Sequence, residues 1–92
     1  MKNHTKFLNF IGYSPRGKIL EWMLVYRKEF TLNDVVSLTK INRSKGYKIL
    51  HKMADEGIIE NIYDIKNLRF WMLNIGNKKV AKLIDLFEKV TE

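Results

Sequence analysis

The fold of this chain is decided by residues 41–57, INRSKGYKILHKMADEG. Residues 40–52 contain five basic side chains and no acidic one. Asn42 is a favourable helix N-cap, because its side-chain oxygen can accept a hydrogen bond from an unpaired N–H of the first turn. Gly57 is a favourable helix end, because a residue without Cβ enters the left-handed conformation without a clash. The stretch therefore predicts a single helix over about residues 42–56.

The side chains of this helix divide into an apolar face and a basic face. Ile49, Leu50 and Met53 recur at helical spacing and predict the face that packs inward. The remaining positions carry cations and polar groups, namely Arg43, Ser44, Lys45, Tyr47, Lys48 and Lys52. A helix that is apolar on one side and basic on the other indicates a polyanionic partner.

The whole chain shares this charge bias. It has 92 residues, with 17 Lys or Arg against 10 Asp or Glu, and a formal net charge of +7. In one small domain such a bias indicates nucleic acid or another anionic surface, with a merely basic soluble protein as the alternative. Hydrophobic residues make up 46% of the chain, which is enough for a core and argues against disorder.

Several function classes are excluded by what the sequence lacks. There is no cysteine, so disulfides, thiol catalysis and cysteine-based zinc sites are ruled out. The two histidines, His4 and His51, lack metal-ligand spacing, and no Gly-rich phosphate loop or nucleophile elbow is present. We therefore expect no enzyme, no metal and no cofactor. No apolar run approaches the roughly 20 residues that span a bilayer, and no secretory signal is present, so we expect a cytoplasmic, nucleoid-associated protein.

Upstream of the basic helix, two further segments have clear boundaries. Residues 1–13 form either an extended arm or a short helix capped by Thr5 and ended by Gly12. Ser14-Pro15 starts a helix that should extend to about Lys28, because Pro is tolerated at the first helical position. Its inward stripe consists of Ile19, Leu20, Met23 and Leu24.

Two cations in the first turn of that helix work against its dipole, which favours anions there. They are Arg16 and Lys18. Either this helix end approaches a phosphate, or the two charges are tolerated on the surface, and the sequence leaves both explanations open.

A short helix is expected directly before the basic one. Thr31 as N-cap and Asp34 three residues later approximate a capping box, and Phe30 can pack back as a hydrophobic staple. The residues expected to face inward are Leu32, Val35, Val36 and Leu38. The helix must stop near Thr39, because only three residues remain before the next helix begins. Two helices joined so closely, the second one basic, predict a helix-turn-helix arrangement.

After Gly57 the hydrophobic period changes. Residues 58–63 are rich in β-branched side chains and residues 68–73 are aromatic and apolar, with polar residues 64–67 between them. This pattern predicts a β-hairpin with a polar and basic tip. Trp71 and Leu73 should share one face of the hairpin, while Phe70 and Met72 share the other.

The last segment predicts a helix over about residues 75–91, capped by Asn74. An apolar stripe recurs along it at a spacing of three and four, formed by Val80, Leu83, Ile84, Phe87 and Val90. The core of one small domain could absorb this stripe. A stripe at the chain end of a small domain also favours pairing with the same helix of a second subunit, and we expect a homodimer.

The order helix, helix, basic helix, β-hairpin, helix resembles the winged helix-turn-helix family of transcriptional regulators. In style it is similar to small archaeal, plasmid or viral regulators of the MarR, ArsR and PadR type. The resemblance is carried by residues 30–60, FTLNDVVSLTKINRSKGYKILHKMADEGIIE, and by residues 70–84, FWMLNIGNKKVAKLI. It implies an α+β, mainly helical fold with a DNA-binding domain over residues 14–74 and a C-terminal dimerisation helix over residues 75–92.

The resemblance also implies roles for individual residues. The basic helix would enter the major groove of double-stranded DNA and present Arg43, Ser44, Tyr47 and Lys48 to the bases. Arg43 is the best candidate for a bidentate contact to guanine. Contacts to phosphate would come from Thr31, Asn33, Lys45 and Lys52, with Arg16 and Lys18 as further candidates. On the wing, Lys66, Asn67 and Arg69 would reach the minor groove or the adjacent backbone.

The sequence departs from the family pattern at two places. Lys40 stands where many members carry Gly in the turn, and a left-handed backbone there would cost Lys roughly 1–2 kcal/mol. Gly46 stands where members usually carry Val or another core residue, and Val36 stands where the preceding helix often has Ala. We hypothesise a volume exchange, in which the larger Val36 fills the space left by Gly46.

The function expected from residues and resemblance together is sequence-specific DNA binding by a dimeric transcriptional regulator. One alternative is an architectural or segregation protein that coats DNA with little sequence preference. Another is a winged helix that binds protein, against which the uninterrupted basic face argues.

Overall fold

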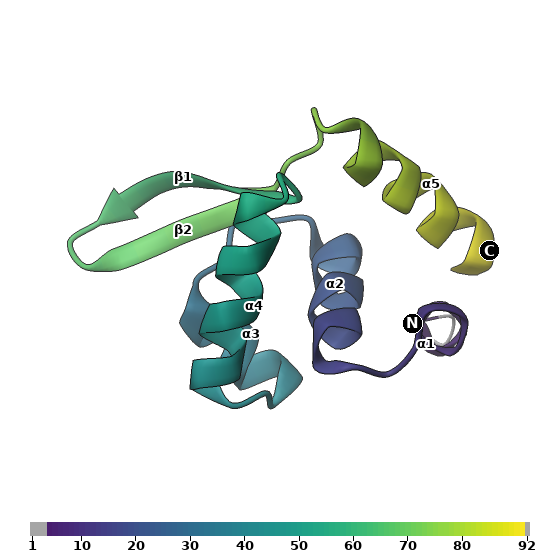
Figure 1. Cartoon of the computed structure of the whole chain (residues 1–92), viewed down its shortest axis with the longest axis horizontal. Coiled ribbons are helices and arrows are strands. Elements are labelled where there is room, and N and C mark those ends of the chain that lie inside the picture. The colour runs from purple at the N-terminus through teal and green to yellow at the C-terminus, as the bar shows by residue number, and fades with distance from the viewer. Residues whose placement is uncertain (1–3, 92) are drawn as a thin grey trace.

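The computed structural model describes residues 4–91, which form five helices and one β-hairpin. In chain order the elements are α1 (His4–Ile11), α2 (Pro15–Tyr26), α3 (Leu32–Thr39), α4 (Arg43–Asp55), β1 (Ile59–Ile65), β2 (Leu68–Leu73) and α5 (Lys78–Thr91). Helices α2, α3 and α4 form one group, and the hairpin projects from it (Figure 1). Helices α1 and α5 lie on the opposite side from the hairpin (Figure 1).

Local capping explains where three of the helices begin. The Ser14 hydroxyl accepts the N–H three residues ahead at 3.0 Å. Thr31 and Asp34 form the predicted reciprocal capping box, with donor–acceptor distances of 3.3 and 2.9 Å. Asn42 accepts two first-turn N–H groups of α4, at 2.9 and 3.3 Å. These three predicted N-caps are confirmed.

The N-terminal boundaries differ in detail from the sequence prediction. Residues 4–11 are helical, so α1 begins before Thr5. Gly12 ends α1 with a φ of 103°, as expected. Helix α2 stops at Tyr26, two residues earlier than predicted, because Arg27 adopts a left-handed conformation.

The prediction that Leu38 faces inward is wrong, because its side chain is 58% exposed. At 3.6 residues per turn, the inward arc of α3 runs from Val35 to Val36 and includes Leu32 and Thr39. Leu38 falls outside that arc, on the far side of Val35. Only the position of α4 against α3 decides which of two neighbouring arcs is covered.

The hairpin has a tighter turn than predicted. Ile65 pairs with Leu68, so Lys66 and Asn67 form a two-residue turn, and residues 64–65 belong to β1. A bulge between Asn61 and Tyr63 shifts the register. The Asn61 side-chain amide donates to the carbonyl of Phe70 at 2.9 Å across the bulge, which links the two strands where the ladder is interrupted.

The hairpin is fastened to the helical group through Phe30. Its backbone exchanges two hydrogen bonds with Trp71, at 2.9 and 2.8 Å, as a short third strand would. The Phe30 ring is buried and lies edge-on to Trp22 of α2, with ring centroids 5.4 Å apart. The link between α2 and α3 therefore holds the base of the wing.

Helix α5 begins three residues later than predicted, and its cap is Asn77 instead of Asn74. The side-chain oxygen of Asn77 accepts the N–H of Lys79 at 2.7 Å. The side-chain amides of Asn74 and Asn77 both donate to the carbonyl of Gly57, at 3.2 and 3.0 Å. The loop before α5 is thereby tied to the left-handed residue after α4, whose φ is 78°.

A single core joins the helices to the base of the wing. Phe7 of α1 is fully buried and meets Phe87 of α5 edge-on, with centroids 5.1 Å apart. Val80 is also fully buried, so two residues of the predicted α5 stripe belong to the core of this chain. The largest fully buried side chains are Phe7, Ile19, Met23, Leu24, Leu50, Met53, Ile59, Val35 and Val80. Across residues 4–91, none of the helices combines the length and the apolar character needed to cross a membrane.

Candidate nucleic-acid interface

Helix α4 has the two faces that its sequence predicts. Leu50 and Met53 are buried and Ile49 is half-buried, so they hold the helix against the core. The basic and polar side chains on the other side are all exposed, namely Arg43, Ser44, Lys45, Tyr47, Lys48 and Lys52. Between Arg43 and Lys52 the exposed side of α4 therefore carries four cations and no acidic side chain.

Gly46 marks the contact between α4 and α3. A Cβ placed on Gly46 would lie 3.4 Å from Leu32 Cδ1 and 3.8 Å from Val36 Cγ2. Val36 does face Gly46, as the volume-exchange hypothesis requires, but Leu32 lies nearer. Both distances are ordinary van der Waals contacts, so a methyl group fits and the packing does not require glycine.

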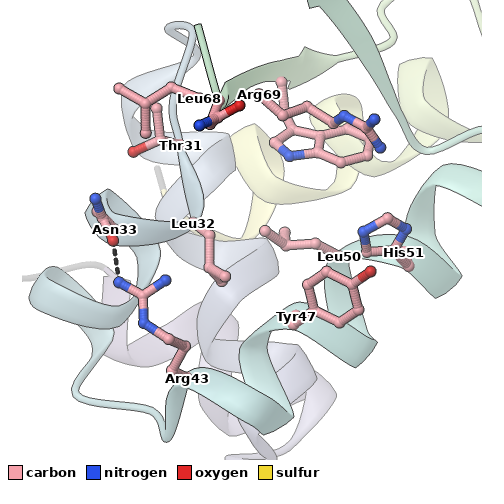
Figure 2. Close-up of a pocket in the computed structure, with 11 residues that line it drawn as sticks. Thr31, Leu32, Asn33, Arg43, Tyr47, Leu50, His51, Leu68 and Arg69 are labelled. Atoms are coloured by element: carbon pink, nitrogen blue, oxygen red, sulfur yellow. Dashed lines mark hydrogen bonds between the residues drawn. The ribbon is translucent and has the colours of Figure 1, made fainter. Parts of the chain in front are cut away.

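A groove of about 390 Å³ separates α4 from the wing. Figure 2 shows Tyr47 and His51 of α4 on one side, with Leu68 and Arg69 of the wing above them. Its lining is Thr31, Leu32, Asn33, Arg43, Tyr47, Leu50, His51, Asn67, Leu68, Arg69 and Trp71. Among these described residues none is acidic, and two are arginines. The groove thus extends the positive surface of α4 onto the wing.

Aromatic contacts connect the two sides of this groove. The rings of Tyr47 and His51 are 4.2 Å apart, and His51 meets Trp71 edge-on at 5.5 Å. The Arg69 guanidinium lies 5.7 Å from the Trp71 ring centroid, within range of a cation–π interaction. Tyr47, His51, Trp71 and Arg69 are therefore linked by successive side-chain contacts from α4 to β2.

Arg43 is held by a neighbouring helix. Its Nη2 donates to Oδ1 of Asn33, at the start of α3 (Figure 2). A guanidinium has five N–H donors, so the others are still available to a ligand. Asn33, predicted as a phosphate contact, is therefore placed to orient Arg43.

The other predicted phosphate contacts lie in different settings. The N–H of Thr31 donates to Asp34, and its side chain is buried in the capping box, so that N–H is occupied within the chain. Lys18 is exposed. Arg16 forms an ion pair with Glu56 at 2.5 Å, and its guanidinium lowers the pKa of that carboxyl below the usual 4.5.

The wing residues converge at its tip. Lys66 occupies the turn with a φ of 55°, and Asn67 follows it. Arg69 lies 3.6 Å from a carboxylate oxygen of Asp64 on the paired strand. The three predicted wing residues are therefore close together, and Asn67 and Arg69 also line the groove.

Five groove residues were not among the predicted site residues, namely Leu32, Leu50, His51, Leu68 and Trp71. His51 lies four positions after Tyr47, so helical periodicity could have placed it on the same face. Trp71 was assigned only to a face of the hairpin, because no pattern in the sequence relates it to a helix 20 residues away. Within residues 4–91, no three His, Cys, Asp or Glu side chains are placed to hold a metal ion.

A short helix, a tight turn, a basic helix and a two-stranded wing define the winged helix-turn-helix fold, and this chain has it. Solved structures show the same arrangement. MepR, a transcription regulator of the Staphylococcus aureus multidrug efflux pump MepA, matches 98% of this chain and 65% of its own, with a TM-score of 0.68 and 16% identity. Reduced HlyU from Vibrio cholerae matches 96% of this chain and 87% of its own, with a TM-score of 0.66 and 17% identity.

A MarR mutant from E. coli, complexed with operator DNA, matches 97% of this chain and 63% of its own, with a TM-score of 0.67 and 11% identity. The chain thus spans just under two thirds of the length of MepR and of MarR. At these identities the likeness establishes the fold. No protein-family profile and no curated protein matches the sequence.

Proposed function

We propose that this chain is a DNA-binding transcriptional regulator that recognises a specific double-stranded sequence. In this proposal α4 enters the major groove, and the wing contacts the minor groove or the adjacent backbone. The carrying observation is the exposed face of α4 over residues 43–52, which holds four cations and no acidic residue, together with the adjoining groove, whose lining includes Arg43 and Arg69 and no acidic residue. The MarR mutant of the same fold, complexed with operator DNA, supports the choice of partner.

Arg43 is the proposed base-reading residue with the best support. Its fork can donate two parallel hydrogen bonds to the O6 and N7 acceptors of guanine. Asn33 restrains the guanidinium before DNA arrives, which lowers the entropy lost when the contact forms. Ser44, Tyr47 and Lys48 are exposed on the same helix and complete the proposed reading surface.

Phosphate contacts are proposed for the cations around this reading surface. Lys45 and Lys52 are exposed on α4, and Lys66 and Arg69 lie on the wing. Arg16 is a weaker candidate, because its ion pair with Glu56 must be broken or shared before it can bind a phosphate.

A homodimer through α5 is part of the proposal, with a smaller surface than the sequence suggests. Val80 and Phe87 are buried in their own chain, and Ile84 and Val90 pack partly against the same core. The contact would therefore be formed by Leu83 and by the exposed parts of Ile84 and Val90. A twofold dimer would place its two copies of α4, the proposed recognition helix, about one turn of DNA apart. That spacing is roughly 34 Å and implies a palindromic site. Sedimentation of the protein alone tests the dimer independently of DNA.

The function is tested by selecting bound fragments from random DNA and then footprinting the protein on the fragment that binds most tightly. We expect one short protected palindrome and an affinity that falls steeply with salt through counterion release. Continuous spreading of protection would favour the DNA-coating alternative. An affinity that does not change with salt would contradict DNA binding altogether.

Two alanine variants separate the proposed roles on α4. Arg43→Ala should relax the preference at one base position by about 1–3 kcal/mol, whereas Lys52→Ala should weaken all sequences about equally. Asn33→Ala should reproduce part of the Arg43→Ala effect, and the double variant should lose little more than Arg43→Ala alone, because the two residues act as one unit. Fully additive losses would show that Asn33 does not act through Arg43.

A further inference from the structure

Three residues other than glycine have positive φ among residues 4–91, and all three are basic. They are Arg27, Lys40 and Lys66, with φ values of 52°, 60° and 55°. In this conformation Cβ crowds the following carbonyl oxygen, which is why such positions favour glycine, and after it asparagine. At each of these three positions the chain therefore has a cation, although glycine or asparagine would be less strained there.

Arg27 has a local structural role that accounts for its side chain. Its Nε donates to the carbonyl of Leu24 at 2.8 Å, and its Nη2 lies 3.4 Å from a carboxylate oxygen of Glu88. It thus links the end of α2 to α5. Within the described chain, the side chains of Lys40 and Lys66 have neither an ion-pair partner nor a hydrogen-bond partner.

Lys40 and Lys66 occupy the turn before α4 and the turn at the tip of the wing. Lys40 ends α3, where its N–H bonds to the carbonyl of Val36 at 3.1 Å, and it lies two residues before the N-cap of α4. Lys66 occupies the two-residue turn at the tip of the wing. Both side chains are exposed, and along the chain α4 lies between the two turns.

We propose that Lys40, together with Lys66, binds backbone phosphates of the DNA, and that strained turn positions are occupied by lysine for this reason. The inference rests on the proposed function and adds Lys40, which no sequence pattern marked as a contact. Both lysines are exposed in their turns, and the lysine ammonium is a mobile point charge on a long stem, suited to a phosphate. In this proposal lysine lowers the stability of the turn but supplies an ammonium group that pairs with phosphate when DNA binds.

Lys40→Gly should remove both the left-handed strain and the phosphate contact, so it tests the two parts of the proposal together. Relief of the left-handed strain should raise the melting temperature by about 4 °C, after allowing for the greater freedom of glycine in the unfolded chain. Loss of one phosphate contact should lower the slope of log affinity against log salt by about 0.9, which corresponds to about eightfold weaker binding at 0.1 M salt. Lys66→Gly should behave in the same way.

Two further variants control for backbone and for net charge. Lys40→Arg keeps a cation on the same left-handed backbone and should keep the wild-type affinity and salt slope. Lys82→Gln removes one exposed cation from α5, on the opposite side from the wing, and should leave the salt slope unchanged. The probe is the selected palindromic duplex, with a scrambled duplex of equal length, and both should respond to Lys40→Gly.

The outcomes separate this inference from the proposed function. If the wild-type protein binds DNA and Lys40→Gly binds equally well with an unchanged slope, Lys40 is not a contact and the inference is overturned while the function stands. A lower melting temperature for Lys40→Gly would show that lysine stabilises the turn, which also overturns it. If the wild-type protein shows no salt-dependent binding to either duplex, the proposed function itself fails.

Discussion

Replacing Gly46 by alanine tests the packing between α3 and α4. The added methyl group would lie 3.4 Å from Leu32 Cδ1 and 3.8 Å from Val36 Cγ2, so neither neighbour has to move. Alanine is about 1 kcal/mol more favourable than glycine inside a helix. Burial of one methyl group adds up to about 0.8 kcal/mol, less the surface that the unfolded chain already buries.

Helix propensity and the buried methyl group together predict that Gly46→Ala raises the free energy of unfolding by about 1–1.5 kcal/mol. For a domain of this size that corresponds to a rise in melting temperature of about 6 °C. Thermal melting followed by circular dichroism and urea denaturation should agree, with a higher urea midpoint and an unchanged m-value. DNA affinity should not change, because the methyl group points at α3 and not into the groove.

Two control variants test whether the space at Gly46 is limited to one methyl group and whether the gain is specific to this position. Gly46→Val adds two further carbons against Leu32 and should destabilise by about 1–3 kcal/mol through overpacking. Gly57→Ala should also destabilise, because Gly57 has a φ of 78° and the new Cβ would lie 2.8 Å from the Asn77 side-chain nitrogen. A lower melting temperature for Gly46→Ala would contradict this packing and would mean that glycine sets the distance between α3 and α4.

Two other predictions concern the ion pair between Arg16 and Glu56 and the contact between α1 and α5. Because Arg16 lowers the pKa of Glu56, the pair contributes stability that is complete above about pH 4.5 and is lost as the pH falls through the lower folded-state pKa. Glu56→Gln should therefore melt below the wild type at neutral pH, with the two curves converging in acid, and a constant gap down to low pH would contradict this. Phe87→Ala should cost about 3–5 kcal/mol and release α1, because the ring is buried against Phe7. Hydrogen exchange should then accelerate in α1 as well as in α5, and protection that persists in α1 would show that it docks without Phe87.

Much of the fold could be predicted from the sequence, because the decisive interactions are local. Ser14, Thr31 and Asn42 cap helices through bonds to residues two or three positions away, and those partners can be identified from the chain alone. The period of the apolar residues likewise identified Leu50 and Met53 as the inward face of α4. The exposed basic face followed from the same periodicity.

The site was predicted less completely, because its geometry depends on contacts between distant segments. The sequence identified Arg43 and Asn33 separately but not the hydrogen bond between them. Asn74 and Asn77 are equally good caps in isolation, and the choice is made by their bonds to the carbonyl of Gly57, 17 and 20 residues earlier. Trp71 joins the groove only because the hairpin folds back beside α4.

By itself the sequence determined the starts of α2, α3 and α4, the two faces of α4, the hairpin and the positive charge, since each is fixed by residues within a few positions of one another. The tertiary structure decided that Val80 and Phe87 pack in their own chain, that Leu38 stays exposed, and that a groove joins α4 to the wing. It also decided that Lys40 adopts a left-handed conformation. These features depend on which surfaces meet when the elements pack, and hydrophobic spacing along one element specifies a face but not the partner that covers it.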